Sequence, residues 1–195
     1  MEIKKVLVIG AGQMGGGIAQ VFTQNGFEVL LNDSFTDAIP KRIDFIEGLL
    51  KKSVSKGKIT EEDKKSTLDN LKPCTDLKEA SDVDLVVEAI VENVDIKASV
   101  IKELNEILRD DVIFATNTSS LPITELAANY KKPENYIGMH FFNPVPVMSL
   151  VEIIRGLATS DETYQAIHEL TEKIGKYPVM VNDVPGFVSN RVLQV

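Results

Sequence analysis

The 195-residue sequence lacks several features on which whole classes of protein depend. Its single cysteine, Cys74, excludes a disulfide framework within the chain and is interpreted as a small core residue. The formal charge of −8 argues against nucleic acid as a general partner. No apolar run reaches the ~18 residues of a membrane span, and a strand predicted from residue 4 leaves no room for a targeting peptide. We therefore expect a cytoplasmic protein without membrane or nucleic-acid partners.

Short apolar runs alternate with stretches of helical periodicity. A strand at 4–9, a helix at 15–25 and a strand at 27–31 form a βαβ unit. Further strands are predicted at 83–90, 112–116, 136–142, 149–154 and 177–181, and further helices at 94–109, 123–129, 161–175 and from 187 onward. Strands rich in Val, Ile and Leu are typical of a parallel sheet that is buried on both faces. The sequence thus predicts a Rossmann-type α/β fold with a doubly wound, mostly parallel sheet.

The segment 37–71 departs from this rhythm. A helix is predicted over 37–55, Gly57 breaks it, and Thr60 is placed to cap a second helix. Lysines gather at the elbow, at positions 51, 52, 56 and 58. We interpret the segment as a helical hairpin that projects from the sheet. A plain solvated charged face is the alternative, and the charge pattern alone favours it.

A glycine-rich turn lies where the first strand meets the first helix. It reads Gly10-Ala11-Gly12-Gln13-Met14-Gly15, a G-x-G-x-x-G motif. Gly10 permits the tight turn, Gly12 lets a pyrophosphate approach the backbone, and Gly15 lets the helix pack closely on the strand. The free N–H groups of the helix N-terminus favour phosphate. The motif in this context predicts dinucleotide binding.

Asp33 ends the second strand, about 20 residues beyond the glycine turn. A carboxylate there can accept hydrogen bonds from the adenosine ribose and would repel a 2′-phosphate. No arginine occurs near Asp33 in the sequence before Arg42, so NAD is favoured over NADP. The alternative interpretation of Asp33 is a polar strand terminus or a helix cap.

Only two histidines are present, and His168 is interpreted as a surface residue. His140 and Glu152 lie equally far from Pro146 along the chain, so an antiparallel hairpin centred there would place them opposite each other. A carboxylate partner fixes the imidazole tautomer and stabilises the imidazolium. The alternatives are a structural histidine and a glutamate that faces solvent on an edge strand.

Small polar residues follow the predicted strand 112–116, where ligands bind in open α/β sheets. Ser119 is therefore a candidate for positioning a substrate oxygen, although 117–120 also fits an ordinary helix-capping run. A hydride acceptor beside an acid–base histidine is what alcohol–ketone interconversion requires. Glu88, within the predicted strand 83–90, is either structural or directed at the cofactor.

The sequence resembles the L-3-hydroxyacyl-CoA dehydrogenase family, especially its short bacterial members that act on 3-hydroxybutyryl-CoA. The resemblance covers the whole chain and rests on five motifs in order: GAGQMGGGIAQ, VVEAIVEN, NTSSLPIT, GMHFFNPVPVMSLVEII and PGFVSNR. It implies an NAD-dependent enzyme that interconverts short-chain (S)-3-hydroxyacyl-CoA and 3-ketoacyl-CoA. No metal site is expected.

The resemblance also assigns roles to residues. It implies that His140 is the general acid–base, that Glu152 orients it, and that Ser119 and Asn190 contact the substrate. The expected cofactor-binding set is Gly10, Gly12, Gln13, Met14, Gly15, Asp33, Glu92, Lys97, Asn117 and Asn143. Within that set, Glu92 and Lys97 are expected near the ribose and nicotinamide. The elbow at 51–58 corresponds to the family's helical arm near the CoA nucleotide.

The domain division is also an expectation from the resemblance. Residues 1–184 form an NAD-binding domain, and 185–195 begin a helical C-terminal domain through which family members form homodimers. Because that domain is present here only in its first turns, we expect NAD binding with reduced activity on acyl-CoA. Two alternatives remain open: a related dehydrogenase of free hydroxyacids, and a non-catalytic NAD-binding module.

Overall fold

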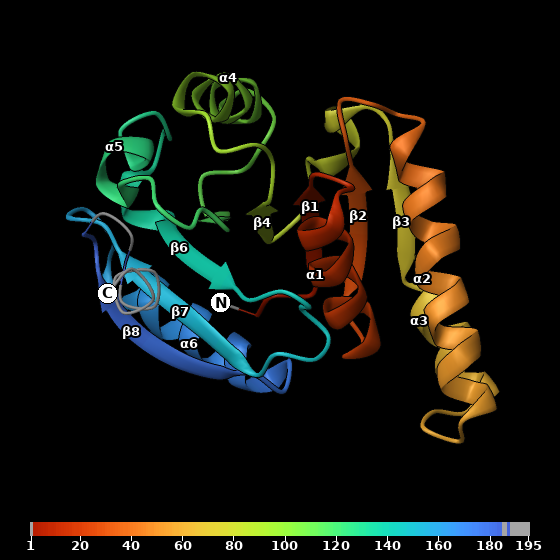
Figure 1. Ribbon diagram of the computed structural model, residues 1–195. Coiled ribbons are helices and arrows are strands. Elements are labelled where there is room, and N and C mark those ends of the chain that lie inside the picture. The colour runs from red at the N-terminus through yellow and green to blue at the C-terminus, as the bar shows by residue number, and fades with distance from the viewer. Residues whose placement is uncertain (1, 185–186, 188–195) are drawn as a thin grey trace.

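The computed structural model describes residues 2–184 and Phe187. Within these residues eight strands form one sheet in the order β3-β2-β1-β4-β5-β6-β7-β8 (Figure 1). The strands are β1 (Lys5–Ile9), β2 (Glu28–Asn32), β3 (Leu71–Cys74), β4 (Leu85–Glu88), β5 (Ile113–Thr116), β6 (Tyr136–Phe141), β7 (Leu150–Arg155) and β8 (Tyr177–Asn182). All neighbouring strands pair in parallel except β6 and β7. The predicted Rossmann-type, mostly parallel sheet is confirmed.

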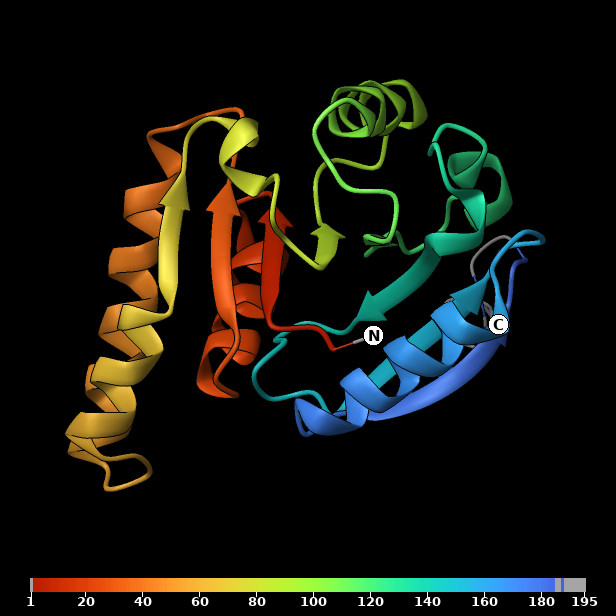
Figure 2. The ribbon, with the colours of Figure 1, turned by 180° about the vertical axis from the view of Figure 1, so that it is seen from behind.

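Helices cover both faces of the sheet, as the two views from opposite sides show (Figures 1 and 2). They are α1 (Gln13–Gln24), α2 (Ala38–Ser55), α3 (Glu61–Asp69), α4 (Val94–Asn105), α5 (Ile123–Ala127) and α6 (Asp161–Lys173), with 3-10 turns η1 (Leu77–Ala80) and η2 (Pro133–Asn135). Side chains of α1, α2 and α6 share one hydrophobic core with the sheet. Side chains of α4 and α5 share the other.

Alternation along the central strands explains why they read as unbroken apolar runs. Val6 and Val8 of β1 enter the core beneath α1, whereas Leu7 and Ile9 enter the core beneath α4. All four side chains are at most 3% exposed. Burial of each such side chain contributes roughly 1.5–3 kcal/mol relative to leaving it in water. A strand in the centre of the sheet is covered by helices on both faces, so the successive side chains of β1 from Val6 to Ile9 are apolar.

The helical hairpin predicted over 37–71 is present, with different bounds. Its two helices are α2 and α3, and they extend along one side of the molecule (Figure 1). Thr60 caps α3 in a reciprocal capping box with Asp63, as predicted for the start of this helix. The chain then enters β3, a strand that the apolar pattern of the sequence did not predict. Pro73 argues against a strand in the sequence, because proline cannot donate to a neighbouring strand. It is tolerated here because β3 lies at the edge of the sheet.

Other predicted bounds need smaller corrections. The helix predicted over 94–109 ends at Asn105, and the strand predicted over 83–90 is confined to Leu85–Glu88.

Among the described residues no helix is long and apolar enough to cross a membrane, and no group of three or more His, Cys, Asp or Glu residues is placed to hold a metal ion. The cytoplasmic location stays a prediction. Cys74 is fully buried in the core beneath α4, which confirms its assignment as a core residue.

The antiparallel pair β6–β7 has the predicted register. Gly138 lies opposite Ile154, and His140 lies opposite Glu152. The connecting loop 143–148 packs on α1, because a Cβ atom at Gly17 would lie 2.9 Å from Cβ of Val145. Lys176 holds the loop from the other side: its Nζ donates to the carbonyls of Val145 and Met148 at 2.6 and 2.7 Å.

Candidate active site

The glycine turn has the geometry that a pyrophosphate requires. Gly10 has φ +106°, and a Cβ there would lie 2.5 Å from the carbonyl oxygen of Ala89. A Cβ at Gly15 would lie 1.8 Å from the carbonyl oxygen of Gly10, so α1 contacts the turn through backbone alone. Gly12 instead faces open space, and no side chain caps the N-terminus of α1. The turn therefore offers an uncovered helix N-terminus to an anion and fits the pyrophosphate of a dinucleotide.

Asp33 is directed at the glycine turn. Its Oδ2 accepts from the backbone N–H of Ala11 at 2.7 Å, and its Oδ1 accepts from that of Phe35 at 2.9 Å. The carboxylate is only partly buried, so it holds the turn in place and leaves part of its surface accessible to solvent. Asp33 therefore does more than terminate a strand.

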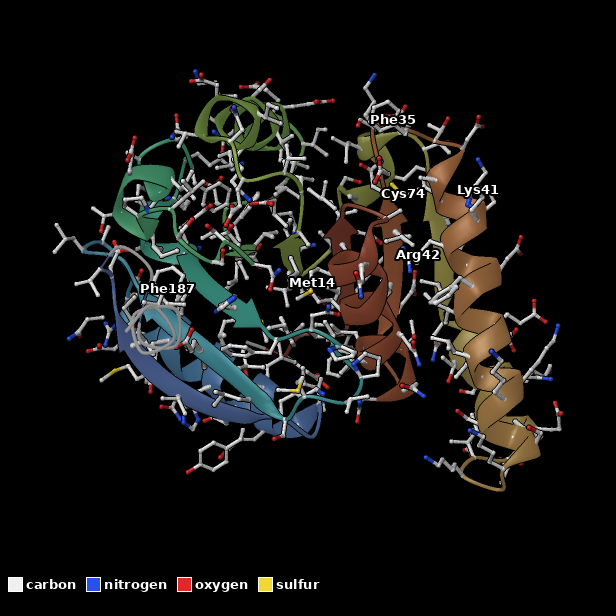
Figure 3. All side chains as sticks on the ribbon, viewed as in Figure 1. Met14, Phe35, Lys41, Arg42, Cys74 and Phe187 are labelled. Atoms are coloured by element: carbon white, nitrogen blue, oxygen red, sulfur yellow. The ribbon has the colours of Figure 1, made fainter. Side chains whose placement is uncertain are left out.

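Arg42 requires a correction to the sequence-based reasoning. It is distant from Asp33 in the sequence, but its Nε donates to the carbonyl oxygen of Ala11 at 2.9 Å. Its guanidinium also lies 5.1 Å from the ring centroid of Phe45. Figure 3 labels Arg42 on the side of α2 that faces α1. Arg42 and Asp33 are thus close in space, since both contact the backbone of Ala11. The absence of an arginine near Asp33 in the sequence is therefore no argument for NAD over NADP.

His140 and Glu152 form a buried pair. Nδ1 of His140 lies 2.8 Å from Oε2 of Glu152, and the two residues are 7% and 2% exposed. With Glu152 as a carboxylate, which only accepts, the shared proton is assigned to Nδ1, and Nε2 is the nitrogen placed to exchange a proton with a ligand. The rings of Phe142 and Phe187 lie 4.7 and 5.9 Å from the imidazole centroid. The predicted contact is confirmed; its catalytic role is a proposal.

A second polar cluster lies at the carboxyl ends of β4 and β5. Oε1 of Glu92 accepts from the backbone N–H of Ser119 at 2.6 Å and from the hydroxyl of Thr118 at 2.7 Å. Burial acts to raise the pKa of Glu92, but these hydrogen bonds and the nearby charge of Lys97 outweigh it and lower the pKa. Lys97 itself is 1% exposed and lies between Glu88 and Glu92. Glu92 and Ser119, both predicted site residues, are therefore in direct contact.

The two predicted asparagines connect separate elements. The side-chain oxygen of Asn117 accepts from the backbone N–H of Phe141 at 2.8 Å and so links β5 to β6. The side-chain oxygen of Asn143 accepts from Nε2 of Gln13 at 3.0 Å and so links the loop 143–148 to α1. The first bond joins the carboxyl ends of β5 and β6, and the second ties the loop after β6 to the helix that begins at the glycine turn.

The alternative interpretation of 117–120 as a capping run holds only in part: Oγ1 of Thr118 accepts from the backbone N–H groups of Ser120 and Leu121, at 3.3 and 3.0 Å, but none of these four residues is the N-cap of α5. The N-cap position of α5 is Pro122, which makes no side-chain capping bond. The carboxylate of Asp183 instead accepts from the backbone N–H groups of Ile123 and Thr124, at 2.9 and 2.8 Å. Asp183 was not singled out in the sequence, because its partners lie about 60 residues away.

A pocket of about 970 Å³ opens between α1, the helical arm and the loop 143–147. One wall is apolar and the rim carries lysines; the lining includes Gln13, Gly17, Arg42, Phe45, Ile46, Leu49, Lys52, Lys56, Lys58, Asn143, Val145 and Val147. His140 and Ser119 do not line it. Gln13 and Asn143 do, and their mutual hydrogen bond marks where the pocket meets the glycine turn.

One family model covers almost the whole described chain. The model described as "3-hydroxyacyl-CoA dehydrogenase, NAD binding domain" matches residues 5–184. The chain belongs to this family. The resemblance drawn from the five motifs is thereby confirmed. NAD, expected from the glycine turn and Asp33, is the cofactor of this family domain.

Relatives of the 3-hydroxyacyl-CoA dehydrogenase family are identical to this chain at about half of the aligned positions. A probable 3-hydroxybutyryl-CoA dehydrogenase of Deinococcus radiodurans is 52% identical over 186 residues, which is 95% of this chain and 66% of that protein. A 3-hydroxybutyryl-CoA dehydrogenase of Clostridioides difficile is 46% identical over 189 residues, 97% of this chain and 67% of that protein. The chain therefore spans about two thirds of the length of these relatives.

Solved structures of the family have the same fold. The (S)-3-hydroxybutyryl-CoA dehydrogenase of Ralstonia eutropha superposes with a TM-score of 0.96 at 45% identity, covering 98% of this chain and 68% of that one. Residue Asn190, expected at the substrate, lies outside the described residues, as does most of 185–195. The domain boundary at 184 and the role of Asn190 stay predictions.

Proposed function

We propose that this chain carries the cofactor site and the acid–base pair of an NAD-dependent dehydrogenase that interconverts short-chain (S)-3-hydroxyacyl-CoA and 3-ketoacyl-CoA. The observation that carries the proposal is the buried contact between Nδ1 of His140 and Oε2 of Glu152. The His140–Glu152 pair lies on the side of the sheet where the parallel strands have their carboxyl ends, which is also the side of the glycine turn. The names of the relatives support the acyl-CoA substrate.

The chemistry follows from the pair. When bound, NAD supplies the acceptor for the hydride that leaves the hydroxyl-bearing carbon. Nε2 of His140 accepts the hydroxyl proton as the C–O bond becomes a carbonyl, and it returns that proton in the reverse direction. Glu152 stabilises the imidazolium formed in this step, because the positive ring gains a charge-assisted hydrogen bond to a buried carboxylate. Ser119 contacts the substrate oxygen from the end of β5.

The residues proposed to contact NAD lie at the carboxyl ends of neighbouring strands. Gly10, Gly12 and Gly15 shape the turn, and the backbone N–H groups that begin α1 at Gln13 and Met14 bind the pyrophosphate. Asp33 accepts from the adenosine ribose. Glu92 and Asn117 lie at the ends of β4 and β5, on the nicotinamide side. Lys97 acts through Glu92, since its ammonium is buried against the two glutamates.

The pocket between the arm and the loop 143–147 suits the CoA part of the substrate. Its apolar wall, with Phe45, Leu49 and Val147, fits the pantetheine chain. Lys52, Lys56 and Lys58 stand on the same rim and provide cations for the phosphate groups. We propose that the complete protein is a homodimer formed through the part of the relatives that lies beyond the match.

The test is a steady-state assay of the complete protein with NADH or NADPH as reductant. Acetoacetyl-CoA and free acetoacetate serve as the two substrates. We expect efficient oxidation of NADH with acetoacetyl-CoA only. Turnover of free acetoacetate at a comparable rate would favour the free hydroxyacid dehydrogenase, and NADH binding without turnover of either substrate would favour a non-catalytic NAD-binding module.

A further inference from the structure

An ion pair beneath the site takes no direct part in the proposed proton transfer. Glu88, the last residue of β4, and Lys97, on α4, are each 1% exposed. Nζ of Lys97 lies 2.6 Å from Oε1 of Glu88. The same oxygen accepts from the backbone N–H of Ile90, and Oε2 accepts from the hydroxyl of Thr116, each at 2.8 Å. Three donors therefore hold Glu88 in place. Of the two interpretations of Glu88 left open above, these contacts favour a residue fixed within the interior over one directed at the cofactor.

The pair is continuous with the site. Nζ of Lys97 also lies 3.4 Å from Oε2 of Glu92, and Oε1 of Glu92 accepts from the backbone N–H of Ser119. Two carboxylates and one ammonium thus form a single cluster with a formal charge of −1. The nearby hydroxyl of Tyr136 adds no charge, because burial raises the pKa of this phenol well above its ordinary value.

The sheet places this cluster on one particular side of the cofactor site. Strand order reverses between β1 and β4, and a dinucleotide binds across the crevice at that reversal. Asp33, at the end of β2, marks the adenosine side. The ends of β4 and β5, with Glu88, Glu92 and Ser119, therefore lie on the nicotinamide side. The nicotinamide ring is positive in NAD⁺ and neutral in NADH, so a nearby negative charge acts on the two forms unequally.

We propose that Glu88 is a specificity-determining residue for the redox state of the cofactor: the single negative charge of the Glu88–Lys97–Glu92 cluster favours binding of NAD⁺ relative to NADH. Glu88 is buried and acts by charge through the low-dielectric interior, where screening by water and salt is weak, whereas the side chain of Glu92, at the other end of the cluster, is 38% exposed. The inference rests on the proposed function only for the position of the nicotinamide.

The experiment compares the dissociation constants of NAD⁺ and NADH. NADH binding is followed by its fluorescence, and NAD⁺ binding by displacement of NADH. Glu88→Gln brings the net charge of the cluster to zero, so the ratio of the NAD⁺ constant to the NADH constant should rise about 3- to 10-fold. The double variant Glu88→Gln/Lys97→Met restores one negative charge, on Glu92, and should return the ratio to within about twofold of the unaltered protein.

The double variant separates charge from structure. A merely structural role of Glu88 would leave the ratio unchanged in Glu88→Gln, or would leave the double variant at least as shifted as the single one. Asp95→Asn is the matched control, because it removes one carboxylate from the exposed first turn of α4, and its ratio should not change.

Glu88→Ser provides a second route if Glu88→Gln does not fold. It removes the same charge with a smaller polar side chain, and we expect the same rise in the ratio. An unchanged ratio in every folded neutral variant would overturn the inference while leaving the proposed function intact. Failure of the unaltered protein to bind either form would overturn both.

Discussion

Nδ1 of His140 lies 2.8 Å from Oε2 of Glu152 across the only antiparallel strand pair of the described sheet, with both residues more than nine-tenths buried. The antiparallel pairing is what makes the contact, because it sets two residues from one hairpin directly opposite each other on the same face. The parallel strands beside it deliver the cofactor turn to the same end of the sheet. The His140–Glu152 pair and the glycine turn therefore lie at the same end of one sheet, which contains both antiparallel and parallel strand pairs.

The glycine turn gives a prediction that separates binding from stability. Gly12→Ala fills the open space beside the helix N-terminus and should weaken NADH binding by about 10-fold or more, with little change in Tm. Gly15→Ala would place a Cβ against the carbonyl of Gly10 and should cost roughly 1–3 kcal/mol of folding stability. Fluorescence titration and thermal unfolding measure the two effects.

Gly48→Ala is the matched control for these substitutions. Gly48 lies inside α2, and a Cβ there would meet no atom within 4 Å. Alanine should stabilise the helix by about 0.5–1 kcal/mol and leave NADH binding unchanged. A loss of NADH affinity in Gly48→Ala, equal to that of Gly12→Ala, would contradict the assignment of the pyrophosphate to the turn.

Asp33 and Arg42 together give a prediction about cofactor choice. Asp33→Ser removes the carboxylate that repels a 2′-phosphate, while the guanidinium of Arg42 stays bound to the carbonyl of Ala11. The ratio of NADPH to NADH affinity should rise by about 10-fold. Arg42→Met in the Asp33→Ser background should lower that gain. A ratio insensitive to both substitutions would show that the adenosine ribose lies elsewhere.

Lys176 gives a prediction about the pocket wall. Its ammonium bonds to two carbonyls of the loop 143–148, so Lys176→Met should loosen that loop and raise KM for acetoacetyl-CoA by about 3- to 10-fold, with NADH affinity unchanged. Lys176→Arg should recover part of the loss. Hydrogen exchange of the amides of Val147 and Met148 reports the loop directly.

Lys131→Met is the control for Lys176→Met. Lys131 likewise donates to a backbone carbonyl, that of Leu108 at 2.6 Å, pairs in addition with Asp110 at 3.0 Å, and does not line the pocket. Its loss should leave both KM and the exchange of the loop amides unaltered. Equal effects of the two substitutions would show that charge loss in general, and not the loop contact, changes KM.

Cys74 gives a prediction about pH. Burial, reinforced by the charges of Glu79 and Asp76, raises the pKa of the thiol to about 11. At pH 8 roughly one thiol in a thousand is then ionised, against about a quarter in the unfolded chain. Alkylation by iodoacetamide should be at least about 200-fold slower in the folded protein than in denaturant at pH 8, and the rate for the folded protein should rise as pH approaches 11. Equally rapid labelling of both forms would contradict this environment.

The sequence predicted those parts of the structure that depend on local periodicity. The apolar runs identified the central strands, and the alternation of a strand placed His140 opposite Glu152 once Pro146 was taken as the centre of the turn. The edge strand β3 escaped because Lys72 and Pro73 interrupt its apolar pattern. Long-range contacts escaped for a different reason: the bonds from Arg42, Lys176 and Asp183 to distant backbone groups follow no period in the sequence.

The most direct test of the account is a comparison of His140→Ala and Glu152→Gln in the complete protein, with acetoacetyl-CoA and NADH. Both substitutions should lower kcat, His140→Ala by about 100- to 10,000-fold and Glu152→Gln by less, while the dissociation constant of NADH changes less than about twofold. A kcat for His140→Ala close to that of the unaltered protein would contradict the acid–base role of the His140–Glu152 pair.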